Sequence, residues 1–122
     1  MLRFFWNMIL SFAKINPLPG KQQVVLDILR SVIGPTRVKS GCIDCAVYTN
    51  QGEGQTILYL EQWQSREPLD RHIRSELYFR VLSAMELANE APEIYFHEVS
   101  DTRGLEYVEA LRTASPANQY LK

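Results

Sequence analysis

The chain has 122 residues, which is the size of one ordinary domain and leaves no material for a second independent core. Its hydrophobic share of 46% and its charged share of 22% are typical of a globular protein. The net charge is −1, with 13 basic residues scattered among 14 acidic ones. This balance argues against nucleic-acid binding, because neutralising phosphates requires a clustered basic surface.

The N-terminal segment 1–14 places Arg3 before an apolar run and has two interpretations. A signal peptide is disfavoured because Asn7 interrupts the run and no small-x-small cleavage site precedes Lys14. The run is also too short to span a bilayer. We therefore expect a β-strand over about 7–15 and no membrane segment. Two cysteines are too few for a disulfide-stapled secreted domain, so a cytoplasmic location is expected.

A helix is predicted after the turn at 17–20. Apolar residues there recur at the spacing of one helix face: Val24, Val25, Ile28, Leu29, Val32 and Ile33. Pro35 should kink or end this helix, because it cannot donate to the preceding turn. One further turn is expected to reach Lys39 before Gly41 closes it.

Two strands joined by a hairpin come next, over 42–49 and 55–63, with glycines in the loop 50–54. Ser65 is then placed to cap a short helix. Ser75 is placed to cap a second helix. The apolar side of the first carries Leu69, His72 and Ile73, and that of the second carries Tyr78, Val81, Leu82 and Met85.

Pro92 ends this helical region, and a fourth strand is predicted over 93–100. The order strand, helix, strand, strand, helix pair, strand is the split β-α-β arrangement of ferredoxin-like α+β folds, with a four-stranded antiparallel sheet. We expect one domain over 1–113, with its core at 8–100 and a C-terminal helix at 103–113. The remaining residues, 114–122, are expected to form a flexible tail.

The predicted strands are apolar on both faces. The third has Ile57, Tyr59 and Trp63 on one face and Leu58 and Leu60 on the other. The others behave similarly, with Ile43, Cys45 and Val47 against Ala46 and Tyr48, and Ile94 and Phe96 against Tyr95 and Val99. A half-solvated antiparallel sheet alternates more cleanly. The helices cover one face and no element remains for the other, so we expect a homodimer.

Cys42 and Cys45 form a CxxC pair, which signals redox or metal chemistry at a helix start or a tight knuckle. In a strand, positions three apart point to opposite faces. No second CxxC completes a four-ligand site, and neither histidine is near in sequence. The pair is therefore interpreted as two small buried or half-buried residues, and no metal is expected.

His72 is the candidate of greatest chemical interest. Period-two counting places Tyr59, Glu61 and Trp63 on one strand face. If the helices cover that face, Glu61 can orient the imidazole as a proton acceptor, and the aromatic rings can form flat walls for a planar ligand. The alternative is a hydrogen-bonded core histidine among core-filling aromatics. His97 has no evident partner and is interpreted as structural or exposed.

Several motifs, in their order and spacing over 8–100, resemble the antibiotic biosynthesis monooxygenase (ABM) family, and within it the small quinol monooxygenases. They are Pro19-Gly20-Lys21, Pro35-Thr36-Arg37, Gly41-Cys42, and Leu60-Glu61-Gln62-Trp63-x-Ser65 followed by Leu69-x-x-His72. The resemblance implies a dimeric α+β barrel with a pocket between the sheet and the helices of each subunit. It also implies oxidation of an aromatic phenol or hydroquinone by dioxygen without flavin, haem or metal. A deprotonated phenolate can itself give an electron to oxygen.

Transferred residue by residue, the resemblance matches Trp63 to the strand-end tryptophan of the family and His72 to the helix histidine of quinol-oxidising members. Tyr59 and Leu69 stand where polyketide-oxidising members have an asparagine and a tyrosine, which argues against polyketide chemistry. We expect Tyr59, Trp63 and Leu69 to contact a small aromatic substrate. His72 would act as the base and Glu61 would orient it.

Haem-degrading relatives need an asparagine on the first strand and a haem-ligating histidine on the second helical segment. This sequence has Ala13 and Leu82 there, so haem degradation is not expected, and no cofactor is predicted. The family also includes many members without demonstrated catalysis. The alternative function is therefore a non-catalytic dimeric domain of the same fold that binds a small molecule or regulates.

Overall fold

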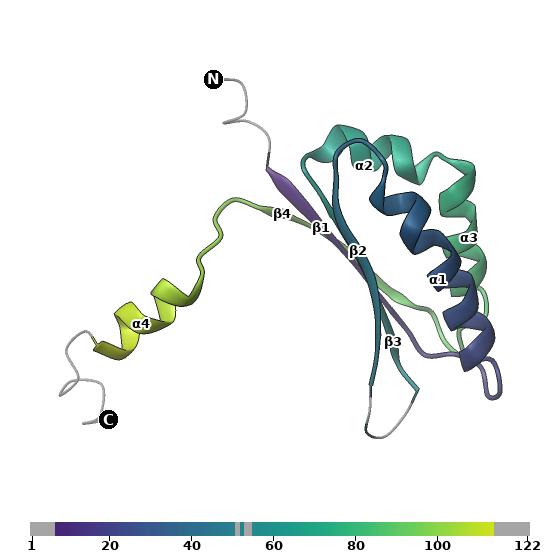
Figure 1. Cartoon of the computed structure of the whole chain (residues 1–122). Helices are drawn as coiled ribbons and strands as arrows, with labels where there is room; N and C mark the ends of the chain where they lie inside the picture. The colour runs from purple at the N-terminus through teal and green to yellow at the C-terminus, as the bar shows by residue number, and fades with distance from the viewer. Residues whose placement is uncertain (1–6, 51, 53–54, 114–122) are drawn as a thin grey trace.

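The computed structural model describes residues 7–50, 52 and 55–113. The elements in chain order are β1 (Met8–Ile15), α1 (Gln22–Arg37), β2 (Cys42–Thr49), β3 (Ile57–Trp63), α2 (Arg66–Ile73), α3 (Glu76–Met85), β4 (Glu93–Val99) and α4 (Leu105–Thr113). The strands form one antiparallel sheet in the order β2-β3-β1-β4. Helices α1, α2 and α3 lie on one face of this sheet (Figure 1). The ferredoxin-like α+β prediction is confirmed.

The face of the sheet under the helices, called the covered face below, holds the core. Burial alternates along β1 and β3, so that every second side chain is buried there. On β3 these are Ile57, Tyr59, Glu61 and Trp63. Glu61 pairs with Ser11 across β1, and both are buried. A carboxylate therefore lies in the middle of an otherwise apolar layer.

The opposite face, called the open face, carries the other half of each strand. Its residues are Met8, Leu10, Phe12, Ala46, Tyr48, Leu58, Leu60, Tyr95, His97 and Val99. Tyr48 is 53% exposed and Tyr95 is 49% exposed. The Phe12 and Tyr95 rings lie side by side, with centroids 6.2 Å apart. The prediction of a second apolar face is confirmed for β3 and β4, and β1 also contributes apolar residues to it.

The prediction for β2 is wrong at its first residues, because a β-bulge shifts the register between Cys42 and Asp44. Cys42 pairs with Trp63 and Cys45 pairs with Glu61, so both cysteines point to the covered face rather than to opposite faces. Ile43, predicted to share a face with Cys45, is 47% exposed. An extra residue in one strand resets the two-residue period on which the prediction depended.

Helix α1 continues through Pro35 to Arg37 instead of ending there. Pro35 falls in the last turn, so its missing N–H leaves one carbonyl of the preceding turn without an intrahelical donor, and only two residues of the helix follow it. The chain then reverses at Gly41, whose φ of +87° favours glycine. A Cβ at this position would lie 2.5 Å from the Cβ of Pro68. Gly41 thus allows the start of α2 to pack against the start of β2.

The two predicted caps have different outcomes. Ser65 occupies the N-cap position of α2, but its side chain makes no capping hydrogen bond. The Ser75 hydroxyl accepts the backbone N–H of Tyr78 at 3.3 Å, which confirms the cap of α3. On α3, Tyr78 and Val81 are buried as predicted, whereas Leu82 points outward and is 45% exposed. The third buried residue of α3 is Ala84 instead.

Helix α4 stands apart from the sheet and the other helices (Figure 1). It has no buried residue, and it begins two residues later than predicted, at Leu105. No helix in the ranges 7–50 and 55–113 is both long enough and apolar enough to cross a membrane. The predictions for the lead 1–6, for hairpin residues 51, 53 and 54, and for the tail 114–122 lie outside the described residues. The single-domain boundary at 113 stays a prediction.

Candidate active site

A buried carboxylate organises the predicted site. Glu61 is fully buried and accepts three side-chain hydrogen bonds. Its Oε2 accepts from the Tyr59 hydroxyl at 2.6 Å and contacts His72 Nε2 at 3.0 Å, while its Oε1 accepts from Trp63 Nε1 at 2.9 Å. Charge-assisted bonds of this kind are the means by which a buried carboxylate stays satisfied.

The neighbours of His72 fix the orientation and tautomer of its imidazole. The ring of Trp63 lies 4.9 Å from the imidazole by centroid distance, and Tyr78 meets it edge-on at 5.3 Å. Lys39 Nζ lies 3.0 Å from Nδ1. An ammonium group only donates, so Nδ1 accepts and Nε2 carries the hydrogen that is donated to Glu61. Nδ1 is therefore the nitrogen whose lone pair faces away from the core.

Lys39 and Ser75 complete the cluster and were not among the predicted site residues. Lys39 Nζ donates to Ser75 Oγ at 3.0 Å, and Ser75 Oγ donates to the backbone carbonyl of His72 at 2.6 Å. The sequence pattern predicts Lys39 as the end of the first helix and Ser75 as the N-cap of a later one. Lys39 lies 33 residues before His72, and no local period links the two positions.

Burial and the charge of Glu61 keep the surrounding weak acids protonated. Burial, and then the nearby Glu61 charge, raise the pKa of Tyr59 well above its ordinary value. The same two causes raise the pKa of Tyr78 to about 12, and burial raises that of Cys45 to about 12. Tyr59 and Cys45 therefore serve as donors: Cys45 Sγ donates to the Tyr59 hydroxyl at 3.3 Å, and Tyr59 donates to Glu61.

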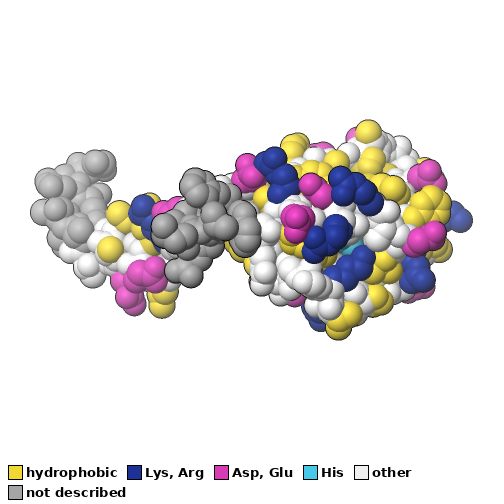
Figure 2. Space-filling model, turned by 90° about the horizontal axis from the view of Figure 1, so that it is seen from above, with side chains coloured by type: hydrophobic (Ala, Val, Ile, Leu, Met, Phe, Trp, Pro, Cys, Tyr) yellow, Lys and Arg dark blue, Asp and Glu magenta, His cyan; other side chains and the backbone are white. Residues whose placement is uncertain are grey.

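The space between the helices and the sheet at this point is filled by the cluster itself. Tyr59 is 2% exposed, and its hydroxyl faces Glu61 rather than an open cavity. A shallow hollow of about 230 Å³ reaches the cluster from outside and is lined by Lys39, Ser40, Trp63, Pro68, Arg71 and His72. Figure 2 shows Lys and Arg side chains gathered around a small area of histidine. Of the five predicted site residues, His72 and Trp63 line this hollow, and Glu61, Tyr59 and Leu69 do not.

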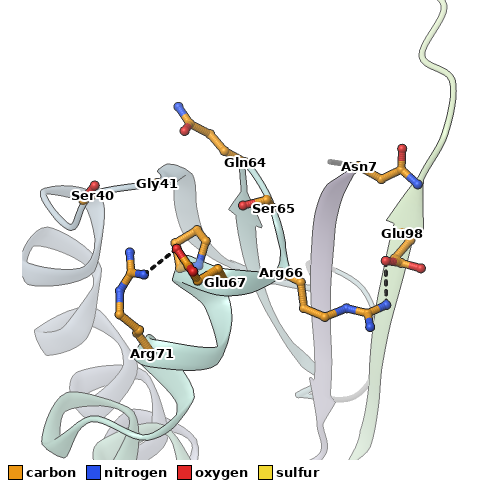
Figure 3. A pocket seen from close by; sticks show the side chains of 10 residues that line it. Asn7, Ser40, Gly41, Gln64, Ser65, Arg66, Glu67, Arg71 and Glu98 are labelled. Atoms are coloured by element: carbon orange, nitrogen blue, oxygen red, sulfur yellow. Dashed lines mark hydrogen bonds and ion pairs between the residues drawn. The ribbon is translucent and has the colours of Figure 1, made fainter. Parts of the chain in front are cut away.

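A larger hollow of about 520 Å³ adjoins this one and shares Ser40, Pro68 and Arg71 with it. Figure 3 shows its lining between the end of α1, the start of α2 and strand β4. Arg71 pairs with Glu67 at 3.0 Å and Arg66 pairs with Glu98 at 2.6 Å, so its charges are mutually compensated. The larger hollow thus lies beside the one that His72 lines, but His72 is not part of its own lining.

The CxxC pair has no metal or redox partner in the described part of the chain. Cys42 is half-buried and Cys45 is buried, as predicted, and both are free thiols. Within the same ranges, no group of three or more His, Cys, Asp or Glu side chains is placed to hold a metal ion. Cys42 packs against Ile9, Trp63 and Leu69 beside the cluster.

Comparison with known protein families identifies the family of the chain. The model of the family described as antibiotic biosynthesis monooxygenase matches residues 8–82, which is more than half of the chain. The chain belongs to the ABM family. The matched range includes β1 to β3 and both residues of the Glu61–His72 pair.

Individual proteins resemble this ABM protein in sequence or in fold. The uncharacterized protein sll1783 of Synechocystis sp. is 26% identical over 92 residues, covering 75% of this chain and 63% of its own length. A conserved protein from Methanosarcina mazei Go1 has a structure with a TM-score of 0.70 and 27% identity, covering 80% of this chain and 98% of that one. The structure of Rv0793 from Mycobacterium tuberculosis gives a TM-score of 0.72 at 23% identity, with 80% and 99% covered.

Proposed function

We propose that this ABM protein oxidises a small aromatic phenol or hydroquinone with dioxygen, without flavin, haem or metal. The observation that carries the proposal is the buried Glu61–His72 pair, whose outward nitrogen Nδ1 borders a hollow next to Trp63. A carboxylate on Nε2 sets the tautomer and stabilises the imidazolium that forms when Nδ1 takes a proton. His72 is then the general base and Glu61 is a positioning residue.

The reaction begins with a proton transfer. The O–H bond of the phenol breaks, its proton moves to Nδ1 of His72, and the electron pair stays on the phenolate oxygen. The phenolate then gives an electron to dioxygen, and the two radicals combine at a ring carbon. For a hydroquinone, one oxygen atom enters the ring and the other leaves as water. The substrate loses four electrons in forming a hydroxyquinone, and dioxygen gains four.

Trp63 is proposed to stack on the substrate ring, because its own ring packs against His72 at the base of the hollow. Tyr59 acts differently from the sequence prediction in this scheme. Its hydroxyl donates to Glu61 behind His72, so it supports the base rather than the substrate. Leu69 packs on Trp63 and Ile9 and fixes the indole from the far side. Contact of Tyr59 or Leu69 with substrate stays a prediction.

We also infer that the chain forms a homodimer through the open face. Phe12, Leu60 and Tyr95 lie on that face, and no helix in the described ranges covers it. Exposed apolar patches of this kind mark association surfaces, and a two-fold pair covers both copies at once. The cytoplasmic location expected from the cysteine content stays a prediction.

The activity is tested by oxygen uptake of purified, metal-free protein with a panel of hydroquinones. We expect uptake above the autoxidation blank for the parent protein and a loss of 100-fold or more for His72→Gln, since positioned general bases contribute about 10²–10⁴-fold. His97→Gln is the matched control, because His97 is exposed on the opposite side of the sheet, and sedimentation velocity checks that this change on the open face leaves the oligomeric state as in the parent. Equal uptake by the parent and His72→Gln, or none above the blank, contradicts the proposal.

The rival function is a non-catalytic domain that binds a small molecule or regulates. One observation favours it: both ring nitrogens of His72 already have protein partners, and its side chain is fully buried. In that case the cluster serves stability and partner recognition alone. Ligand binding to the hollow without any oxygen uptake would support this rival.

A further inference from the structure

Lys39 is the one member of the cluster whose charge the proposed function has not used. It follows α1, and its backbone N–H donates to the carbonyl of Thr36 at 3.0 Å, which holds it near the helix end. From there its half-buried side chain reaches His72 Nδ1 and Ser75 Oγ, both at 3.0 Å. The ammonium group therefore lies directly on the nitrogen that the proposed mechanism uses as a base.

The partners of Lys39 are neutral, unlike those of the arginines beside it. Arg66 and Arg71 are each paired with a carboxylate, whereas no ion pair in the described part of the chain joins Lys39 to an acid. Glu61 is the acidic side chain of the cluster, and the His72 imidazole lies between Glu61 and Lys39. The hollow over His72 has Lys39 and Arg71 in its lining and no carboxylate, and of these two cations Arg71 is already paired with Glu67. An anionic oxygen is the group that this arrangement lacks.

The size of the hollow restricts the ligand. Its volume of about 230 Å³ is below the range of roughly 300–1,000 Å³ typical of pockets for drug-sized ligands. One aromatic ring is the ligand that this volume suits, and the Trp63 indole provides an aromatic neighbour for it.

We propose that Lys39 binds the phenolate oxygen of a single-ring substrate, and that it is a further catalytic residue beside His72. This inference rests on the proposed function and names the group that stabilises its anionic intermediate. The phenol oxygen takes the place of Nζ at Nδ1 and delivers its proton there. Nζ keeps its bond to Ser75 Oγ and donates to the new oxyanion. A fixed cation aimed at a developing negative charge lowers the barrier to its formation.

The test uses 4-nitrophenol, whose phenol and phenolate forms absorb at different wavelengths and which needs no oxygen to report binding. Titrated into the parent protein, it is expected to bind mainly as the phenolate. The ratio of phenolate to phenol should be at least tenfold higher on the protein than in free solution at the same pH. Lys39→Gln keeps a hydrogen-bond donor for Nδ1 but removes the charge, and it should abolish this increase. Lys39→Arg should keep most of it.

Lys21→Gln is the matched control, because Lys21 is an exposed lysine at the start of α1, and it should behave as the parent. Thermal unfolding of each variant separates a folding defect from a change at the site. A phenolate ratio that stays high in Lys39→Gln overturns the inference, and so does the absence of nitrophenol binding to the parent.

Nitrophenol binding and oxygen uptake test the role of Lys39 and the oxidation reaction separately. Nitrophenolate stabilisation that depends on Lys39, without any uptake of oxygen from hydroquinones, refutes the oxidation and retains the phenolate site. Oxygen uptake that depends on His72, with kcat, KM and the nitrophenol spectrum unchanged in Lys39→Gln, refutes the role of Lys39 alone.

Discussion

The two faces of one sheet have the same strands and opposite chemistry. On the covered face, the apolar layer surrounds Glu61, a carboxylate with three hydrogen-bond donors. On the open face, aromatic and aliphatic side chains such as Tyr48 and Tyr95 remain about half exposed. A buried charge is tolerated only where directed partners satisfy it, while an apolar surface needs only area to cover it. We therefore propose that the covered face serves chemistry and that the open face serves association.

Removing the Glu61 carboxylate is expected to have the largest effect on the difference between the two faces. Glu61→Ala leaves the donors of Tyr59, Trp63 and His72 without an acceptor in a buried site. We expect the free energy of unfolding to fall by roughly 3–5 kcal/mol, the usual cost of removing one partner from a buried charged pair. Urea denaturation followed by tryptophan fluorescence measures this change.

Glu98→Ala is its control, because Glu98 and Arg66 form an ion pair with side chains 50% and 66% exposed. An exposed pair contributes about 0–1 kcal/mol, so this variant should stay close to the parent. A loss below about 1 kcal/mol for Glu61→Ala would mean that the cluster contributes little to the covered face.

A charge placed on the open face tests its proposed role in association. Leu60→Lys puts an ammonium between Phe12 and Ala46, its cross-strand neighbours, where a second copy would bury it. We expect self-association to weaken at least 100-fold, about 2.8 kcal/mol, as measured by sedimentation velocity over a concentration series.

Val38→Lys changes an apolar residue that is 84% exposed at the end of α1, away from the open face, and should leave the oligomeric state unchanged. A parent protein that sediments as a monomer at every concentration would remove the basis for the homodimer.

Alkaline pH gives the smallest expected effect and probes the covered face without mutating Glu61. The pKa of Tyr78 rises from 10.0 to about 12 on folding, because the phenol is buried and the Glu61 charge lies nearby. Above pH 10 the unfolded chain therefore holds fewer protons than the folded one. Stability that is fully present below pH 10 is then lost as the pH rises toward 12, by up to about 1.4 kcal/mol per pH unit for this group.

Tyr78→Phe removes this titration, so its free energy of unfolding should fall less steeply than that of the parent over that interval. Denaturant titrations at a series of pH values measure both slopes. Parallel slopes for the two proteins would show that the Tyr78 phenol ionises as easily in the folded chain as in the unfolded one.

Much of the fold and part of the site followed from short-range patterns. Period-two counting placed Tyr59, Glu61 and Trp63 on one face of a strand, and the helical period placed His72 on the apolar side of its helix. Both patterns depend on backbone geometry within a few residues, and the structure brings these four residues together as that geometry requires. The family motifs lie in the same segments.

The tertiary structure decided three features that the strand and helix periods do not encode. A β-bulge turned Cys42 to the same face as Cys45, because one inserted residue resets the alternation of β2. Packing of α1 against α3 brought Lys39 to His72 and Ser75, over 33 and 36 residues of sequence. Packing also filled the space beside Tyr59 and left a hollow at Lys39 instead. Where a strand or helix is regular, the sequence determines which residues share a face, and close packing between distant segments determines which of them touch and where a ligand can enter.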